Sequence, residues 1–433
     1  MKRYIIQSGK LKGNLTVPTS KSHTLRAILF ASLASGKSII RHYLSSPDTK
    51  AMIEACCQLG AIIERHQDYL IIQGVAGKPK VPDNIIDAGN SGQVLRFIGA
   101  IAGLISNYTV ITGDSSVRHN RPVEPLLSGL QQLNALAESS RGDNLAPIII
   151  RGPMRAGNLE IEGSDSQPVS GLLMACAFLP GESIIKVKQP GEKSWVALTL
   201  DWFKRLGIEV EHQDFAYYKI KGHSSYQGFN YTVPGDFSSL AFPIAAALIT
   251  GSEITINPVD MNDVQGDKEL ISVLEQMGAE FIYDKTNLKL TVKACRQLKG
   301  RVVNINNFVD AVTILAVIGC YAQGETIITG AAIARQKECN RLLAICTELK
   351  KMGADIQETE DGLKIRSSKL KGTLVKSYHD HRMVMSLAVA GLMAEGETII
   401  NDIACVSKSF PGFCRSMQGI AMPIKEEEVN NGQ

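Results

Sequence analysis

The stretch Gln323-Gly324-Glu325-Thr326-Ile327-Ile328-Thr329 carries the pattern that decides the fold. An apolar helix is predicted before it, the glycine marks a tight turn, and a β-branched strand follows. The same pattern recurs at Ala34-Ser35-Gly36-Lys37-Ser38, Pro180-Gly181-Glu182-Ser183, Thr250-Gly251-Ser252-Glu253 and Glu395-Gly396-Glu397-Thr398, and more weakly at Ser106-Asn107-Tyr108-Thr109. An internal repeat of about seventy residues therefore organises the chain.

The second half of each repeat also recurs. A helix ends at Leu59-Gly60-Ala61, Leu133-Asn134-Ala135, Leu206-Gly207-Ile208, Met277-Gly278-Ala279 or Met352-Gly353-Ala354, and Gln418-Gly419-Ile420 is a degenerate copy. A strand, a turn and another strand follow each one. The chain therefore predicts six β-α-β-α-β-β units, with sheets layered around a core of apolar helices. The boundary between two halves of three units lies near Val233-Pro234-Gly235-Asp236, and we expect a ligand-binding cleft between the halves.

Length and composition restrict the class of protein. A chain of 433 residues exceeds one ordinary core, so two domains are expected. A net charge of +3, without basic tracts, does not suggest nucleic-acid binding. The start, Met1-Lys2-Arg3-Tyr4-Ile5-Ile6-Gln7, predicts a strand and not a signal peptide, and no apolar run is long enough for a membrane span. Nine scattered cysteines without a C-x-x-C pair favour reduced thiols in a cytoplasmic protein and make a zinc site unexpected.

A charged heptapeptide, Arg335-Gln336-Lys337-Glu338-Cys339-Asn340-Arg341, lies where the predicted strand gives way to a helix. Lys337 and Arg341 are four apart and are predicted to share a helix face, where like charges repel. An anion bound between them at a helix start would remove that cost. A solvated helix face is the alternative for this heptapeptide alone.

Other polar motifs also fall at predicted element ends: Ser20-Lys21-Ser22 with Arg26, Gly89-Asn90-Ser91-Gly92 with Arg96, Arg118-His119-Asn120-Arg121, Gly163-Ser164-Asp165-Ser166-Gln167, Asp310, Asp380-His381-Arg382 and Lys408-Ser409. Each has a structural alternative: serine capping, turn chemistry, or for Asp310 a helix N-cap. Together they gather cations around two carboxylates, Asp310 and Glu338. Such a set suits substrates that carry phosphates and carboxylates, with carboxylates for proton transfer.

The ordered set of motifs resembles the EPSP synthases (3-phosphoshikimate 1-carboxyvinyltransferases) over essentially the whole chain. It comprises Ser20-Lys21-Ser22, Arg26, Gly89-Asn90-Ser91-Gly92, Arg96, Arg121-Pro122, Pro234-Gly235-Asp236-x-Ser238-Ser239, Asp310-Ala311, Lys337-Glu338-x-x-Arg341, Asp380-His381-Arg382-Met383 and Lys408-Ser409-Phe410-Pro411. The resemblance implies two inside-out α/β domains of three repeats each. One comprises residues 1–19 and 237–433, the other residues 20–236, and the active site lies in the cleft between them.

The resemblance also implies a reaction: transfer of the enolpyruvyl group of phosphoenolpyruvate to the 5-hydroxyl of shikimate 3-phosphate, releasing phosphate, in the shikimate pathway of aromatic amino acid biosynthesis. By position, Lys21, Asp310 and Glu338 are catalytic. The implied shikimate 3-phosphate site is Lys21, Ser22, Arg26, Ser166, Gln167, Ser194, Asp310 and Lys337. The implied phosphoenolpyruvate site is Lys21, Gly92, Arg121, Gln167, Arg341, Arg382 and Lys408. Asn90 and His381 support the site, no metal or organic cofactor is implied, and a cytoplasmic monomer is expected.

The departures from the family pattern lie on the acceptor side. Gln93 stands where Thr is usual, Asp165 where a phosphate-binding Ser is usual, and Trp195 where Tyr or Arg is usual; Leu25 and Asn340 replace an Asn and an Asp. Either Asp165 turns away from the acceptor phosphate to a cation such as Lys193 or to backbone N–H groups, or the acceptor carries no phosphate there. We expect the first, with Ser166 and Ser194 binding the phosphate.

Two alternatives remain. An enolpyruvyl transferase acting on UDP-N-acetylglucosamine is disfavoured, because the loop at residues 118–121 lacks that enzyme's cysteine. A non-catalytic anion-binding homologue is disfavoured by the presence of both Asp310 and Glu338.

Overall fold

The computed structural model describes residues 1–428 of the chain. The chain divides into two compact units, Lys21–Val233 and a discontinuous unit made of Met1–Ser20 and Pro234–Gln433. We call these the continuous and the discontinuous unit. Each has its own hydrophobic core, and each contains three four-stranded sheets.

The continuous unit is built from three sheets and seven helices. In spatial order the sheets are β14 (Asn230–Thr232), β3 (Lys37–Arg41), β5 (Tyr69–Gln73), β4 (Ile62–Arg65); β6 (Ile86–Asp87), β7 (Tyr108–Thr112), β9 (Ile148–Arg151), β8 (Leu136–Ser139); and β10 (Asn158–Glu162), β11 (Ser183–Lys188), β13 (Tyr217–Ile220), β12 (Val210–Gln213). The helices are α1 (Lys21–Leu33), α2 (Pro47–Gln58), α3 (Gly92–Ala102), α4 (Ser115–Asn120), α5 (Glu124–Gln132), α6 (Ser166–Cys176) and α7 (Lys193–Leu206).

The discontinuous unit repeats this plan. Its sheets are β16 (Phe281–Asp284), β17 (Lys289–Val292), β15 (Glu253–Asn257), β2 (Lys12–Thr16); β18 (Val302–Asn304), β19 (Glu325–Thr329), β21 (Leu363–Arg366), β20 (Asp355–Glu358); and β22 (Leu374–Lys376), β23 (Thr398–Asn401), β1 (Lys2–Ile6), β24 (Ile424–Glu428). Its α-helices are α8 (Phe237–Ile249), α9 (Glu269–Gln276), α10 (Val312–Tyr321), α11 (Arg341–Lys351), α12 (His381–Gly391) and α13 (Phe413–Gln418). Short 3₁₀ helices are η1 (Gly266–Lys268), η2 (Asn306–Ala311), η3 (Ala332–Gln336) and η4 (Ala404–Lys408).

All six sheets share one topology. In each sheet one outer pair of strands is parallel, as in β10 with β11 or β2 with β15, and the remaining pairs are antiparallel, as in β11 with β13 and β12 with β13. A parallel pair needs a crossover. The buried helix between the strands supplies it for β6 with β7, β10 with β11, β18 with β19 and β22 with β23, whereas β14 and β2 reach their partners β3 and β15 from distant parts of the chain. The predicted β-α-β-α-β-β unit, six times repeated, is therefore confirmed.

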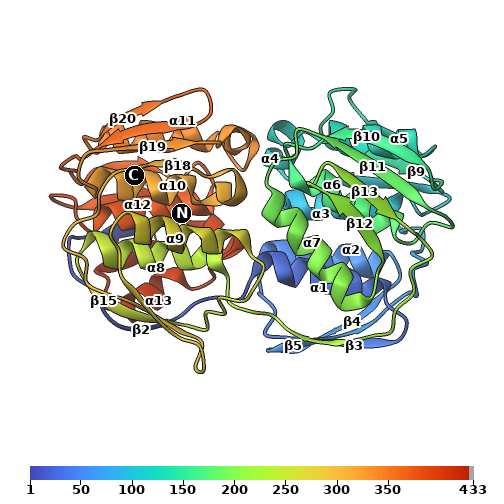
Figure 1. The fold of residues 1–433 in the computed structure, drawn as a ribbon, viewed down its shortest axis with the longest axis horizontal. Helices are drawn as coiled ribbons and strands as arrows, with labels where there is room; N and C mark the ends of the chain where they lie inside the picture. Colours follow the sequence, from blue (N-terminus) through green and yellow to red (C-terminus); the bar gives the residue numbers. More distant parts are fainter. Residues whose placement is uncertain (429–433) are drawn as a thin grey trace. The chain divides into compact units, whose positions relative to one another are not determined.

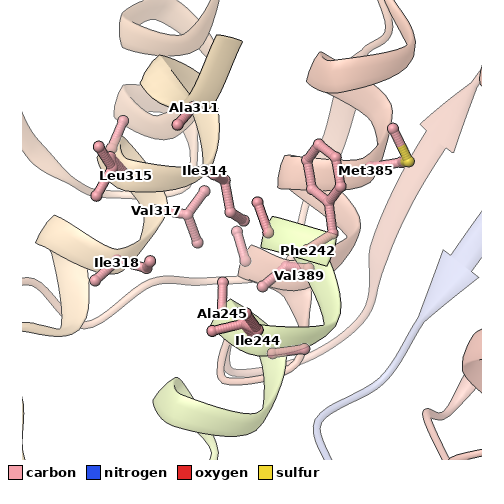
Figure 2. Close-up of a cluster of buried hydrophobic side chains, with 14 of the residues drawn as sticks. Phe242, Ile244, Ala245, Ala311, Ile314, Leu315, Val317, Ile318, Met385 and Val389 are labelled. Carbon is pink, nitrogen blue, oxygen red and sulfur yellow. The ribbon is translucent and has the colours of Figure 1, made fainter. Parts of the chain in front are cut away.

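Apolar helices form the interior of each unit and the sheets lie outside them, which confirms the predicted inside-out α/β fold (Figure 1). Every residue of α8 is buried, and so is nearly every residue of α1. A helix that is apolar all round must be buried on all sides. Figure 2 shows the contact between the central helices of the discontinuous unit, where Phe242 and Ala245 of α8 pack near Ile314 and Val317 of α10 and Val389 of α12.

This arrangement positions the polar motifs. Because each crossover helix starts directly after a short first strand, its N-terminus carries the residues that the sequence places at element ends. The helices α3, α6, α8 and α12 begin with the side-chain caps Ser91, Asp165, Asp236 and Asp380, respectively.

Candidate active site

A cluster of three cations and three carboxylates forms at the helix starts of the discontinuous unit. We call it the Arg341 cluster; its members are Asp310, Glu338, Arg341, Asp380, Arg382 and Lys408. The guanidinium of Arg341 lies at its centre and is 1% exposed. Its Nη1 donates to Asp310 Oδ1 at 2.7 Å, its Nη2 to Glu338 Oε2 at 2.6 Å, and its Nε to Asp380 Oδ2 at 2.7 Å.

The two carboxylates predicted to be catalytic are each shared between two cations. Asp310 Oδ2 accepts from Nη2 of Arg382 at 2.7 Å, in addition to its bond from Arg341. Glu338 Oε1 accepts from Nζ of Lys408 at 2.6 Å, in addition to its own bond from Arg341. The structure therefore brings these five predicted residues into one network of direct contacts.

Local structure explains how these side chains are presented. Helix α11 begins at Arg341, and the side chain of Asn340 caps it by accepting from Leu343 N at 3.2 Å. Lys337 lies between η3 and α11 with a non-helical backbone. The prediction that Lys337 and Arg341 share a helix face is therefore wrong, because the helix begins four residues later than the charge pattern suggested. Lys337 is nevertheless 9% exposed and acts electrostatically on Asp310.

Asp310 is not a helix cap. It lies within η2, α10 begins after Ala311, and no side chain caps that helix. The solvated-face alternative also fails for Glu338 and Arg341, which are buried. Burial alone would raise the pKa of Asp310, but Arg382, Arg341 and Lys337 outweigh it and hold that pKa well below its usual value. Asp310 is thus an ionised carboxylate at any ordinary pH.

In the continuous unit, the start of α1 carries the second group of predicted residues. Lys21 Nζ lies 3.5 Å from Oδ2 of Asp48, which also accepts from Ser91 Oγ at 3.1 Å. Arg26 is 1% exposed, and burial lowers its pKa to about 9. It donates to Thr199 Oγ1 at 3.0 Å and to the carbonyls of Trp195 and Ser22 at 3.1 and 3.3 Å. Because these acceptors are neutral, the charge of Arg26 can still serve an anionic ligand.

Gly92 is the point where several predicted donor-site residues converge. A Cβ on Gly92 would lie 2.7 Å from Nη1 of Arg96 and 3.1 Å from both Nη1 of Arg121 and Oε1 of Gln167. Arg96 also donates to the carbonyl of Pro122 at 2.8 Å, beside Arg121. The absence of a side chain at Gly92 therefore allows this approach of cations and amide.

Asp165 is turned toward Arg96. Its Oδ2 lies 3.0 Å from Nη2 of Arg96, and its Oδ1 accepts from the N–H of Gln167 at 3.0 Å. The expected pairing with a cation and with backbone N–H groups is found, but the cation is Arg96 and not Lys193. Arg96 lies on α3, whereas Asp165 caps α6 of the next repeat. Sequence spacing alone could not show that these two residues are close together.

Ser166 has a partner that the sequence analysis missed. Its hydroxyl donates to Oε2 of Glu192 at 3.2 Å, and its N–H donates to the same oxygen at 3.3 Å. Glu192 is 2% exposed and has the left-handed φ of 45° at the start of α7. Ser194 and Trp195 follow on the same helix.

The two supporting residues also lie near charged groups. Asn90 Nδ2 donates to Asp114 Oδ2 at 2.6 Å, and the buried His381 has its Nδ1 3.7 Å from Oδ1 of Asp380. Four carboxylates contact predicted site residues without having been assigned such a role beforehand: Asp48, Asp114, Glu192 and Asp380. A carboxylate in the first turn of a helix was the only available signal, and it marks ordinary caps as well.

The described part of the chain lacks two further features, a metal site and a membrane-spanning helix. Residues 1–428 contain no group of three His, Cys, Asp or Glu side chains that could hold a metal ion. None of the helices within that range is both long and apolar enough to cross a membrane.

Comparison with known proteins places this geometry in a family. The family profile described as EPSP synthase (3-phosphoshikimate 1-carboxyvinyltransferase) matches residues 5–417. The chain belongs to the EPSP synthase family. A 3-phosphoshikimate 1-carboxyvinyltransferase of Acetivibrio thermocellus is 43% identical over 408 residues, covering 94% of this chain and 96% of that protein. One from Chlamydia pneumoniae is 41% identical over 430 residues, covering 98% and 95%.

Solved structures agree with the sequence relatives. The EPSP synthase of Acinetobacter baumannii, solved at 2.37 Å, superimposes with a TM-score of 0.82 at 27% identity, covering 99% of this chain and 100% of that one. The family resemblance read from the ordered motifs is therefore confirmed over the whole chain, and the Arg341 cluster is a feature of an EPSP synthase family member.

Proposed function

We propose that this protein transfers the enolpyruvyl group of phosphoenolpyruvate to the 5-hydroxyl of shikimate 3-phosphate, giving 5-enolpyruvylshikimate 3-phosphate and phosphate. The observation that carries the proposal is the Arg341 cluster, in which Asp310 and Glu338 are each shared between two buried or nearly buried cations. The family membership of the chain supplies the reaction.

The cations serve the donor. Phosphoenolpyruvate carries a carboxylate and a phosphate, and guanidinium groups bind both through paired hydrogen bonds. Asp310 and Glu338 are surrounded by three buried cations, Arg341, Arg382 and Lys408. When phosphoenolpyruvate binds, these cations release the two carboxylates and bind the anionic groups of the donor instead. Arg121, Gln167 and the space over Gly92 complete the donor site together with Lys21.

The acceptor is held by the residues that remain. Arg26, with neutral hydrogen-bond acceptors only, supplies a buried positive charge, and Ser22 lies one helical turn before it. Ser166, Gln167 and Ser194 lie at the starts of α6 and α7 and offer hydrogen bonds to the phosphate. Lys337 and Asp310 bind the hydroxyls, so that Asp310 reaches the one that reacts.

Proton transfer follows from the positions of the two carboxylates. Glu338 delivers a proton to C3 of phosphoenolpyruvate, which makes C2 cation-like. Asp310 takes the proton of the attacking hydroxyl, and the hydroxyl oxygen forms a bond to C2. Removal of a proton from C3 then expels phosphate, which Lys21 stabilises. In the ligand-free structure Arg341 and Arg382 depress the pKa of Asp310. Donor binding to these arginines releases Asp310 and raises its basicity, as general-base catalysis requires.

The nine cysteines are all free thiols. Free thiols are expected in a reducing compartment. We therefore assign the enzyme to the cytoplasm. As separate parts of the proposal, the enzyme acts as a monomer and uses no metal or organic cofactor.

The test is phosphate release. Purified protein mixed with phosphoenolpyruvate and shikimate 3-phosphate is expected to release phosphate, whereas either substrate alone is not. The Asp310→Asn variant keeps the shape of the side chain but cannot accept the proton, and we expect a 10²–10⁴-fold loss of kcat with acceptor affinity within a few-fold of wild type. Normal turnover by this variant would show that Asp310 is not the base.

A further inference from the structure

The motif Pro234-Gly235-Asp236-x-Ser238-Ser239 helped to identify the family but received no role in the reaction. In the structure it is fixed to the segment 265–267. Gln265 is fully buried, its Nε2 donates to the carbonyl of Gly235 at 2.9 Å, and its Oε1 accepts from Phe237 N at 3.2 Å. The hydroxyl of Ser238 donates to Oδ2 of Asp267. The start of α8 and η1 therefore form one rigid support.

This support holds a buried carboxyl group against the Arg341 cluster. Asp267 is 3% exposed. Its helix, η1, packs against η2, which carries Asp310, and both Asp310 and Arg382 act electrostatically on it. Oδ1 of Asp267 and Nε of Arg382 are both buried and have no hydrogen-bond partner among residues 1–428. Two neighbouring side chains thus have a buried hydrogen-bonding atom without a partner, a carboxylate oxygen on Asp267 and a guanidinium N–H on Arg382. Buried polar atoms rarely stay without a partner unless the site uses them.

We propose that Asp267 is a positioning residue of the enolpyruvyl transfer: it holds the guanidinium of Arg382 through the Nε–H that Asp310 does not use, and its negative charge increases the basicity of Asp310. The proposal rests on the assignment of Asp310 as the base. It explains how Arg382 stays in place after donor binding draws it away from Asp310, because Asp267 still attracts its guanidinium.

The ionisation of Asp267 makes this role dependent on pH. Burial, together with the charge of Asp310, raises the pKa of Asp267 to about 7, against the opposing effects of Arg382 and Ser238. Asp236 at the start of α8 also raises it. Further charged groups nearby are the exposed Glu269 at the start of α9, the buried Asp263, and Lys268 on η1, whose Nζ donates to the carbonyls of Met261 and Asp263. Below neutral pH Asp267 is protonated and resembles an asparagine. Above neutral pH it is charged, and Asp310 becomes the stronger base.

The Asp267→Asn variant isolates this charge, since asparagine can still accept the hydrogen bond of Ser238. We expect the ratio of wild-type kcat to variant kcat to be near one below about pH 6 and to rise to about threefold or more above pH 8. A merely structural role would lower kcat by the same factor at every pH. The control is Asp263→Asn, since Asp263 lies on the same segment and its carboxylate accepts from Gln265 N, away from Arg382; its ratio should stay flat.

A second variant tests the proposal even if Asp267→Asn fails to fold. Removal of the hydroxyl in Ser238→Ala takes away a hydrogen bond that lowers the pKa of Asp267, so the pH at which kcat rises should move upward. A ratio for Asp267→Asn that does not change between pH 5.5 and 9, or an unmoved profile for Ser238→Ala, would overturn the role of Asp267 and leave Asp310 as the base. Normal turnover of Asp310→Asn would instead overturn the base assignment itself.

Discussion

At the scale of single residues, Asp165 shows how a charge can be tolerated beside a proposed phosphate site. An unpaired carboxylate about 5 Å from a phosphate charge would repel it by about 3 kcal/mol at an effective dielectric constant near 20. In the structure Asp165 is paired with Arg96 and with the N–H of Gln167. The charge is therefore largely compensated before any ligand arrives.

We expect Asp165→Ser to change the KM for shikimate 3-phosphate by less than about tenfold, since the variant removes a charge that was already paired. Steady-state kinetics with shikimate 3-phosphate and with unphosphorylated shikimate measure this. Asp201→Ser is the matched control, because Asp201 is paired with Arg205 at 2.5 Å on α7 and has no role in the reaction. A wild type that prefers shikimate, with the preference reversed in Asp165→Ser, would contradict the assigned acceptor.

The sequence singles out the residues of the candidate site, but it does not show which side chains from other elements they contact. Lys21, Arg341 and Asp310 stand out because charged groups follow apolar strands or precede apolar helices. Their partners, such as Asp48 for Lys21, come from other elements of the unit. Only the packing of the helices brings them together, and a single sequence contains no record of which helix starts are neighbours.

At the scale of elements, the turn after the second helix of each repeat depends on a left-handed backbone. Gly60, Gly207, Gly278 and Gly353 have φ values of 102°, 69°, 105° and 94°, and Asn134 occupies the equivalent place with a φ of 65°. Asparagine tolerates this region better than most residues but less well than glycine. In the sixth repeat Ala421 takes this place with a φ of 63°, so the repeat is locally strained in two of its copies.

We expect Asn134→Gly to raise the free energy of unfolding by up to about 1 kcal/mol, because glycine relieves the strained φ. The opposite change, Gly278→Ala, should lower it by about 1 kcal/mol through backbone strain alone. A Cβ at Gly278 would lie 3.7 Å from its nearest neighbour, the carbonyl oxygen of Gln297, so steric overlap does not contribute. Urea unfolding curves of both variants measure the effect, and a destabilised Asn134→Gly would show that the asparagine side chain makes a needed contact.

Sequence patterns predicted which helices and strands are present better than they predicted where each one begins and ends. The glycine turns and β-branched strands gave all six repeats, because period and turn chemistry are local properties. The start of α11 was misplaced at the charged heptapeptide, since η3 and an extended Lys337 come before the helix. Short 3₁₀ turns leave no distinct pattern of apolar residues, so they are read as part of the neighbouring helix.

At the scale of the whole molecule, the chain completes each sheet within one unit. The strand β14, near the end of the continuous unit, pairs with β3 near its beginning. In the discontinuous unit, β1 lies between β23 and β24, and β2 forms the edge beside β15. The two connecting segments are tied together, because Ser20 N donates to the carbonyl of Pro234 at 2.8 Å and Thr19 bridges to Gly235.

This connectivity predicts that the two units differ in what they need to fold. Residues 21–233 contain three complete sheets and their own core, so we expect this segment alone to unfold cooperatively in urea. Residues 234–433 alone lack β1 and would expose the edges of β23 and β24, so we expect aggregation or a non-cooperative transition. A circular permutant that continues from Gln433 through a short Gly-Ser linker to residues 1–20 restores both strands. The linker can be short, because Lys2 of β1 is paired with Glu428 of β24. Circular dichroism and urea unfolding of the three proteins decide between the outcomes. If residues 234–433 folded cooperatively without β1, or if the permutant did not, the first twenty residues would not be the part of the chain that completes this core.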